Sequence, residues 1–269
     1  MSLSTHAMFV IEPGARIGAN VKIGPFCHVG ADVELGDGVE LISHVAVHGR
    51  TKIGSGTRIF PFASIGHQPQ DLKYHGEPST LEIGSNCQIR EGVTMNPGTE
   101  GGRMTTTVGD NCTFLANSHV GHDCKVGSHV ILSNNVMLAG HVTLGDYVIC
   151  GGGAAVIQFA RVGSHAFVGG MSGLENDLIP YGLALGNRAH LAGLNLVGLR
   201  RRGFSREAIH DLRRAYRLLF AAEGTLKERM EDVAAEFENH PQVHEILDFI
   251  RAGNDRSICT PRDVKESAA

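Results

Sequence analysis

The sequence contains no tryptophan, and only 6% of its residues are aromatic, so its core must consist mainly of aliphatic side chains. No stretch approaches the roughly 18 uninterrupted apolar residues that a membrane-spanning helix needs. The first ten residues lack the charged and apolar regions of a secretion signal, and we therefore expect a cytoplasmic protein. A net charge of −4 argues against a general nucleic-acid-binding protein.

Glycine, in contrast, is abundant, with 35 of 269 residues. An aliphatic residue recurs every six positions over 11–65, 83–95 and 108–168; of these 24 positions, 21 are Ile, Leu or Val, and glycine follows 14 of them. A period of six fits no helix, but it is typical of a β-solenoid built from hexapeptides. Three hexapeptides form one coil, so residues 18 apart are expected to stack on neighbouring coils. The sequence predicts an all-β solenoid over residues 1–188.

Cysteines follow the same repeat. Four occupy the small-residue position two places before an aliphatic residue, and a fifth occupies the aliphatic position itself: Cys27, Cys87, Cys112, Cys124 and Cys150. A buried thiol behaves as a small apolar side chain. Because the sequence also has no CxxC pair, we expect these cysteines to be structural and reduced.

Two polar segments rich in glycine and proline interrupt the repeat, at residues 67–82 and 96–107. We call them the first and second excursions. Solenoids carry such insertions at their corners, where binding loops are often found. The alternative is that either excursion is a simple loop insertion.

Residues 189–269 are predicted to form a small helical domain. Residues 205–222 place apolar side chains on one face, Thr225 and Glu228 form a capping box before a second helix, and Pro241 and Gly253 bracket a third. This domain is expected to cover the open edge of the solenoid.

Two surface features point to partners. Ile131, Ile149 and Phe167 occupy outward positions 18 residues apart, an apolar stripe that suggests a subunit interface, or else packing under a loop or the helical domain. Residues 200–217 hold seven arginines against Glu207 and Asp211, which suits a phosphate group or an acidic partner protein.

The candidate chemistry lies in the run from Asn117 to Asp123. His122 is 18 residues before Gly140, so an imidazole is expected beside a backbone without a side chain. This arrangement suits acyl transfer, in which histidine is the general base and a backbone N–H binds the oxyanion. Asp123 orients His122 only if a turn brings the two side chains together. Metal binding by the histidines, or their burial in an interface, are the alternatives.

No GxSxG element, P-loop, dinucleotide fingerprint or cysteine nucleophile accompanies this cluster. A base acting directly on a bound acceptor, without an acyl-enzyme, is therefore favoured.

Five segments together resemble the acyl-ACP–UDP-N-acetylglucosamine O-acyltransferases, where ACP is acyl carrier protein. They are the hexapeptide repeat, Gln70–Tyr74, His119–Cys124, Leu138–His141 and Gly198–Arg206. The resemblance implies a left-handed parallel β-helix followed by a small C-terminal α-helical domain, a homotrimer with sites between subunits, and no metal or other cofactor. It also implies the first step of lipid A biosynthesis, the transfer of a (3R)-3-hydroxyacyl chain from ACP to the glucosamine 3-hydroxyl of UDP-N-acetylglucosamine.

The resemblance also implies roles for single residues. His122 is the expected general base, Asp123 its partner, Gly140 the oxyanion donor, and Gly170 the position that measures acyl length. The expected substrate-binding residues are Asp71, Lys73, His119 and His141 for the sugar and the carrier, and Gln158, Asn195, Arg201 and Arg202 for the nucleotide.

Two positions depart from the family pattern. Ile157 stands where members often have histidine, and Asn96-Pro97 where His-Arg is common. Transfer to a 3-amino sugar, an acetyl-CoA-dependent acetyltransferase, a metal enzyme on the same fold and a non-catalytic scaffold are the alternative functions.

Overall fold

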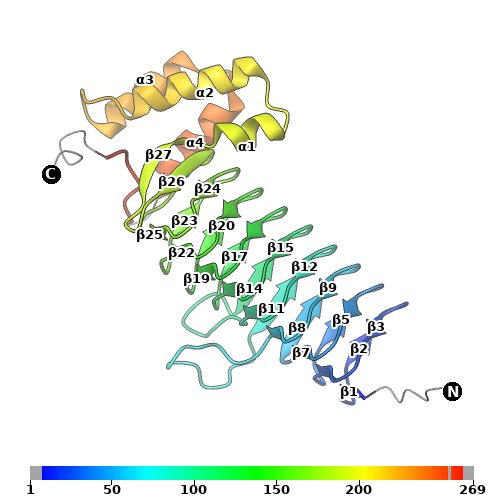
Figure 1. The fold of residues 1–269 in the computed structure, drawn as a ribbon. Coiled ribbons are helices and arrows are strands. Elements are labelled where there is room, and N and C mark those ends of the chain that lie inside the picture. Colours follow the sequence, from blue (N-terminus) through cyan, green and yellow to red (C-terminus); the bar gives the residue numbers. More distant parts are fainter. Residues whose placement is uncertain (1–7, 254–255, 263–269) are drawn as a thin grey trace.

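The computed structural model describes residues 8–253 and 256–262, which form a long parallel β-helix with a group of helices at its C-terminal end (Figure 1). The first seven residues, part of the segment examined for a secretion signal, lie outside the described residues, as do 254–255 and 263–269. The hexapeptide solenoid predicted from the repeat is confirmed, because each coil contributes one short strand to each of three sheets.

Up to β25 the strands follow the order expected for a triangular coil, so that every third strand belongs to the same sheet, whereas β26 and β27 both join the third sheet. The first sheet contains β1 (Val10–Ile11), β4 (His28–Val29), β7 (Ala46–Val47), β10 (Ser64–Ile65), β13 (Thr94–Met95), β16 (His119–Val120), β19 (Met137–Leu138), β22 (Ala155–Val156) and β25 (Gly173–Leu174). The second contains β2 (Arg16–Ile17), β5 (Glu34–Leu35), β8 (Arg50–Ile53), β11 (Thr80–Ile83), β14 (Thr105–Val108), β17 (Lys125–Val126), β20 (Thr143–Leu144) and β23 (Arg161–Val162). The third contains β3 (Lys22–Ile23), β6 (Glu40–Leu41), β9 (Arg58–Ile59), β12 (Gln88–Ile89), β15 (Thr113–Phe114), β18 (Ile131–Leu132), β21 (Ile149–Cys150), β24 (Phe167–Val168), β26 (Gly182–Leu185) and β27 (His190–Leu194).

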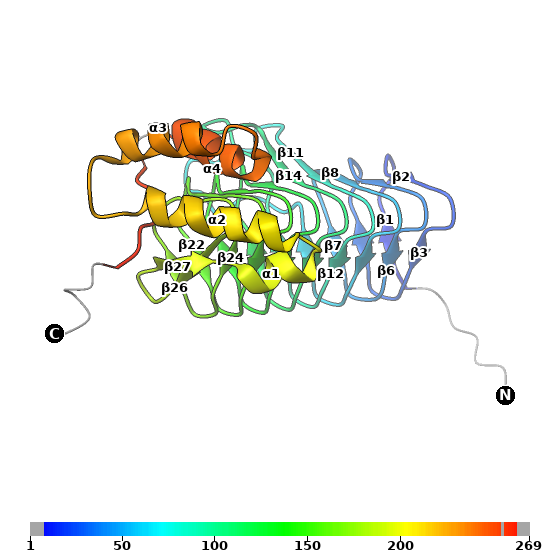
Figure 2. The same cartoon turned by 90° about the horizontal axis from the view of Figure 1, so that it is seen from above.

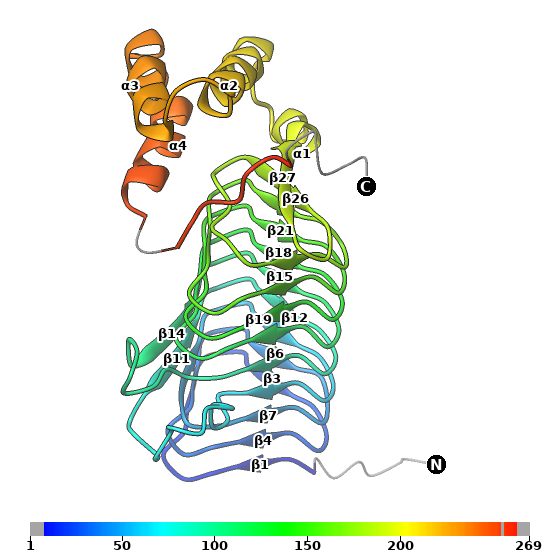
Figure 3. The same ribbon diagram turned by 90° about the vertical axis from the view of Figure 1, so that its left-hand side faces the viewer.

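Register between coils follows the predicted spacing of 18, as in the pairing of Leu132 with Cys150 and of Cys150 with Val168. The excursions lengthen two coils, so Ile53 pairs with Ile83 and Met95 with Val120. Both excursions leave the β-helix at the corner between the first and second sheets and protrude from the same edge (Figure 3).

Inward aliphatic side chains form one continuous core along the β-helix, and all six cysteines are free and buried. This burial agrees with the structural role predicted for the five cysteines of the repeat. The corners are made by left-handed turns, and 17 of the described residues other than glycine have a positive φ. Asn, Asp and His are common among them because these residue types tolerate that conformation best.

The helical domain contains α1 (Leu196–Arg201), α2 (Arg206–Leu219), α3 (Leu226–Glu236) and α4 (Pro241–Arg251). The three predicted helices are confirmed, and the capping box of Thr225 and Glu228 is present at the start of α3. The short helix α1 and the antiparallel pairing of β26 with β27 were not predicted. The domain boundary predicted at residue 188 falls in the turn between these two strands.

Seen from above, α2 and α3 lie side by side over one end of the β-helix (Figure 2). Arg161 of β23 joins the two parts, because its guanidinium donates to the carbonyls of Phe249 and Ala252 at the C-terminal end of α4 and to the carboxylate of buried Asp177. Among the described residues, none of the helices combines the length and the apolar character required to span a bilayer.

Candidate active site

Two columns of residues meet at the corner between the first and second sheets. The register of β16, β19 and β22 stacks Gly140 above His122 and Gln158 above Gly140. The neighbouring column contains Asp123 and His141, and the predicted proximity of these residues is therefore present.

A left-handed turn brings His122 and Asp123 together. Asp123 has a φ of 59°, which turns its side chain back toward the residue before it. As a result, His122 Nδ1 lies 2.8 Å from Asp123 Oδ2. A carboxylate only accepts hydrogen bonds, so Nδ1 carries a proton, and in the neutral form of the imidazole Nε2 is the nitrogen that can accept one.

The carboxylate of Asp123 is fully buried, and the second excursion encloses it. Thr99 donates to it through its hydroxyl at 2.7 Å and its N–H at 3.1 Å, and the Arg103 N–H donates at 2.7 Å. Burial alone raises the pKa of Asp123, but the hydrogen bonds from His122, Thr99 and Arg103 outweigh it and lower that pKa. Asp123 is therefore held as a carboxylate.

The free side of His122 faces the first excursion and the next coil. Its Nε2 lies 4.0 Å from Asp71 Oδ2, and a Cβ on Gly140 would lie 2.5 Å from it. Glycine is therefore the only residue type at position 140 that leaves the imidazole of His122 in place. Within the described residues, no hydrogen bond uses the Gly140 N–H. Lys73 is exposed on the first excursion, where its N–H donates to Asp71.

Two further histidines flank the pair. The ring of His141 meets the ring of His122 edge-on at 5.0 Å and stacks on Phe159 at 4.3 Å. His119 Nδ1 lies 2.7 Å from the Thr94 hydroxyl. Burial lowers the pKa of both His119 and His141, so both are neutral near pH 7.

His122, Asp123 and His141 also offer atoms within 4.8 Å of one another, close enough to consider a metal ion. The oxygens of Asp123 already accept the four hydrogen bonds from His122, Thr99 and Arg103.

Cys124 follows Asp123 directly in the sequence, but burial raises its pKa to about 12, so its thiol is not a nucleophile near neutral pH. The arrangement suits proton transfer to and from His122 Nε2.

A groove of about 620 Å³ runs along the first sheet beside this corner. It is lined by the polar residues His119 and Gln70 and otherwise mainly by small or apolar side chains, among them Met137, Ala155 and Ile157. The position and composition of this groove suit a ligand with an apolar hydrocarbon chain whose reactive end lies near His122.

The residues predicted to bind the nucleotide lie at two different corners of the β-helix. Gln158 is exposed at the corner that holds His122. Asn195 caps α1 and donates to the His165 carbonyl, and the Arg202 guanidinium donates to the Tyr147 carbonyl at 2.7 Å. His165 and Tyr147 belong to the corner between the second and third sheets.

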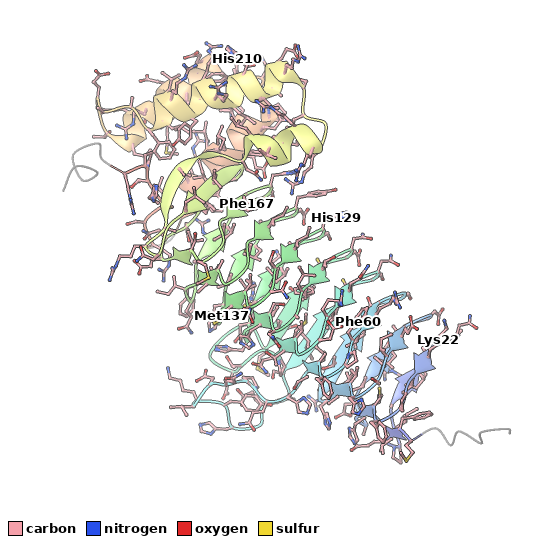
Figure 4. All side chains as sticks on the ribbon, in the orientation of Figure 1. Lys22, Phe60, His129, Met137, Phe167 and His210 are labelled. Carbon is pink, nitrogen blue, oxygen red and sulfur yellow. The ribbon has the colours of Figure 1, made fainter. Side chains whose placement is uncertain are left out.

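Asn195, Arg201 and Arg202 line a separate cavity of about 560 Å³. Its apolar wall includes Ile149 and Phe167, so part of the predicted stripe faces α1 within the same chain. Gly170 lies at the third corner, between β24 and β25. One chain therefore does not bring all the predicted site residues together. Figure 4 labels Met137 on the first sheet and Phe167 on the third.

Sequence reasoning missed the contacts of Thr99 and Arg103 with Asp123. These contacts join residues 24 and 20 positions apart, whereas the repeat predicts neighbours at 18. The polar composition of the second excursion was the only signal of its role.

Comparisons with known proteins agree with this architecture. The family model described as UDP N-acetylglucosamine O-acyltransferase, domain 2, matches residues 177–259, and the bacterial transferase hexapeptide model matches residues 14–49 and 105–140. An acyl-ACP–UDP-N-acetylglucosamine O-acyltransferase from Rhizobium johnstonii is 55% identical over 260 residues, which are 97% of this chain and 96% of that protein.

A protein of the same name from Methylobacterium radiotolerans is 75% identical over 207 residues, 77% of this chain and 76% of that protein. The solved structure of LpxA from Acinetobacter baumannii has a TM-score of 0.91 and 40% identity, covering 94% of this chain and 98% of that one. The predicted fold class, a left-handed parallel β-helix followed by a helical domain, is confirmed.

Proposed function

The chain belongs to the acyl-ACP–UDP-N-acetylglucosamine O-acyltransferase family, and we propose that its His122 corner performs this transfer at the glucosamine 3-hydroxyl. The protein is an acyltransferase of the first step of lipid A biosynthesis. The acyl group is a (3R)-3-hydroxyacyl chain carried as a thioester on the phosphopantetheine of ACP. The observation that carries the proposal is the buried pair of His122 and Asp123, with Nε2 of His122 free beside Gly140.

In the proposed mechanism, His122 Nε2 removes the proton of the 3-hydroxyl while that oxygen attacks the thioester carbonyl. The Gly140 N–H donates to the oxyanion of the tetrahedral intermediate. The intermediate then collapses, the carbon–sulfur bond breaks, and the imidazolium returns its proton to the departing thiolate. Asp123 remains ionised and keeps the imidazole in one tautomer. No resident cofactor is needed, because the thioester arrives already activated.

Binding roles follow from the surroundings of His122. Asp71 lies 4.0 Å from Nε2, the ring of His141 lies against that of His122, and His119 is close enough for the charge of His122 to affect it. The polar groups of these three residues suit the sugar hydroxyls. Lys73 at the exposed rim suits the approach of the carrier. The groove along the first sheet offers about 620 Å³ for the acyl chain. Gln158, Asn195, Arg201 and Arg202 would hold the nucleotide.

We infer that the protein acts as a homotrimer, since its site residues lie at different corners of one β-helix. Three-fold packing of such prisms sets the His122 corner of one subunit against a different surface of the next. The apolar stripe of Ile131, Ile149 and Phe167 is only partly buried in one chain, which supports its use in that interface.

Mixed trimers test this arrangement. His122→Ala and Arg202→Ala proteins are each expected to be nearly inactive. If each site takes its two halves from neighbouring subunits, random mixing of the variants restores an intact site at about a quarter of positions. If both halves come from one chain, mixing restores no activity.

ACP is the proposed protein partner. Exposed arginines of α2, including Arg206, Arg213 and Arg217, form a basic surface that suits an acidic carrier. A cytoplasmic location is proposed because all six cysteines are free and buried, which is typical of a reducing compartment.

The decisive experiment incubates the purified protein with UDP-N-acetylglucosamine and a series of 3-hydroxyacyl-ACP donors. Mass spectrometry of the nucleotide sugar is expected to show a gain of one hydroxyacyl group, and the best donor gives the acyl length. No product from any donor contradicts the proposal. Product formed only with a 3-amino sugar or with acetyl-CoA would identify the alternative acceptor or donor.

A further inference from the structure

The second excursion does more than fill a corner, because it makes most of the contacts of the Asp123 carboxylate. We propose that Thr99 is a positioning residue for the catalytic pair, holding Asp123 in line with His122 through its hydroxyl group. This inference rests on the proposed function of His122 as the general base. Thr99 itself does not face the space where substrate would bind, since its side chain is buried against Asp123.

The two carboxylate oxygens have distinct partners. Oδ2 accepts from the Thr99 hydroxyl at 2.7 Å and from His122 Nδ1 at 2.8 Å. Oδ1 accepts from the N–H groups of Thr99 at 3.1 Å and Arg103 at 2.7 Å. Three of the four donors therefore belong to the second excursion, and Thr99 supplies two of them.

The excursion also fixes the backbone of Asp123. The Asp123 N–H donates to the Thr106 hydroxyl at 2.8 Å, and the Arg103 guanidinium donates to the Asp123 carbonyl. Gly102 lies directly on the carboxylate, because a Cβ there would lie 2.3–2.5 Å from all three of its atoms. A loop held this closely sets both the position and the rotation of the Asp123 side chain.

Oδ2 of Asp123 accepts hydrogen bonds from Thr99 and from His122 at the same time, and this affects its basicity. A carboxylate oxygen that accepts a second strong hydrogen bond is less basic, so it attracts the imidazolium less strongly. Without the Thr99 hydroxyl, Asp123 would hold the protonated imidazole more tightly and orient it less well. The other charged or titratable groups around the pair are Asp71, Arg103, His119, Cys124 and His141.

Thr99→Val removes the hydroxyl and keeps the shape of the side chain. We expect kcat to fall about tenfold, with KM for UDP-N-acetylglucosamine little changed, and the acid limb of the kcat pH profile to move to higher pH. Thr99→Ser retains the hydroxyl and is expected to restore both quantities. Thr105→Val is the matched control, because its hydroxyl bonds to Thr80 and not to Asp123.

A second pair of variants tests the loop without touching Thr99. Gly102→Ala places a methyl group against the Asp123 carboxylate, whereas Gly101→Ala meets nothing within 4 Å. Of these two variants, we expect only Gly102→Ala to lose activity and to show a shifted acid limb in the kcat pH profile. This comparison also decides the question if Thr99→Val does not fold.

The proposal is overturned if Thr99→Val keeps the kcat and the pH profile of Thr105→Val. It is equally overturned if Thr99→Ser loses as much activity as Thr99→Val, or if both glycine variants behave alike. Each of these results requires an active wild-type enzyme. Absence of wild-type product would instead contradict the proposed function.

Discussion

The side chains of His122 and Asp123 meet at 2.8 Å although the two residues are neighbours in the chain. Consecutive side chains of a strand point to opposite faces, so this contact depends on the left-handed turn at Asp123, with its φ of 59°. Proteins keep such turns at residues other than glycine where the surrounding structure enforces them. Here, as at the other corners, the coil of the β-helix enforces the turn, and the second excursion then holds the carboxylate of Asp123 in place.

Replacement of His122 by alanine is expected to remove the general base and leave the fold intact. The imidazole is half-buried at a corner and is not part of the aliphatic core, so the thermal midpoint should change little. Loss of a general base lowers kcat by about 10²–10⁴-fold. Steady-state rates with saturating acyl-ACP measure this effect.

His44→Ala is a suitable control for the loss of an imidazole. His44 lies at the third corner of an N-terminal coil, between Phe26 and Phe62. The His44→Ala variant should retain the wild-type rate. Near-normal turnover by His122→Ala would remove this residue from the mechanism.

Gly140→Ala tests the space around the base. The new Cβ would lie 2.5 Å from His122 Nε2, so the imidazole must move away from the acceptor hydroxyl. We expect kcat to fall about 10²-fold, as when catalytic groups are misplaced by about 1 Å. Gly30→Ala is the control at the same corner, because its Cβ would find its nearest neighbour at 3.5 Å. Equal rates for the two variants would show that His122 tolerates the methyl group.

His165 predicts a pH dependence of stability. Burial, together with the nearby Arg202 charge, lowers the pKa of His165 to about 4, whereas histidine in an unfolded chain titrates near 6.5. Between these values the unfolded chain binds more protons than the folded chain. The free energy of unfolding should therefore decrease as the pH falls from about 6.5 to about 4.

His165→Phe is expected to retain the aromatic stack with Tyr147 and Tyr181 and to remove the group that takes up a proton in the unfolded chain. Its thermal midpoint should fall less than that of the wild type between pH 7 and pH 5. Parallel loss of stability in both proteins would mean that other groups control the acid sensitivity.

The fold was largely predictable because a period of six specifies both strand and turn at every repeat. The same arithmetic placed His122 beside Gly140. It did not predict α1 or the pairing of β26 with β27, since these elements are short and follow no repeat. Nor did it predict the contact of Thr99 with Asp123, because the excursion breaks the spacing of 18 that the rest of the corner obeys.

Gly170→Met is expected to shorten the preferred acyl chain. A Cβ at Gly170 would lie 3.2 Å from the Gly152 carbonyl oxygen and 3.8 Å from the Gly152 nitrogen, with no other contact within 4 Å, so small shifts can accommodate the new side chain. If the acyl terminus reaches this corner, the methionine occupies the space of its last methylenes. Each buried methylene contributes about 0.8 kcal/mol, so displacing two lowers kcat/KM for the longest donor by more than tenfold. Competition between donors of different length measures the change, and Gly170→Ala should give a smaller one. An unchanged order of donor preference in Gly170→Met would place the chain terminus elsewhere.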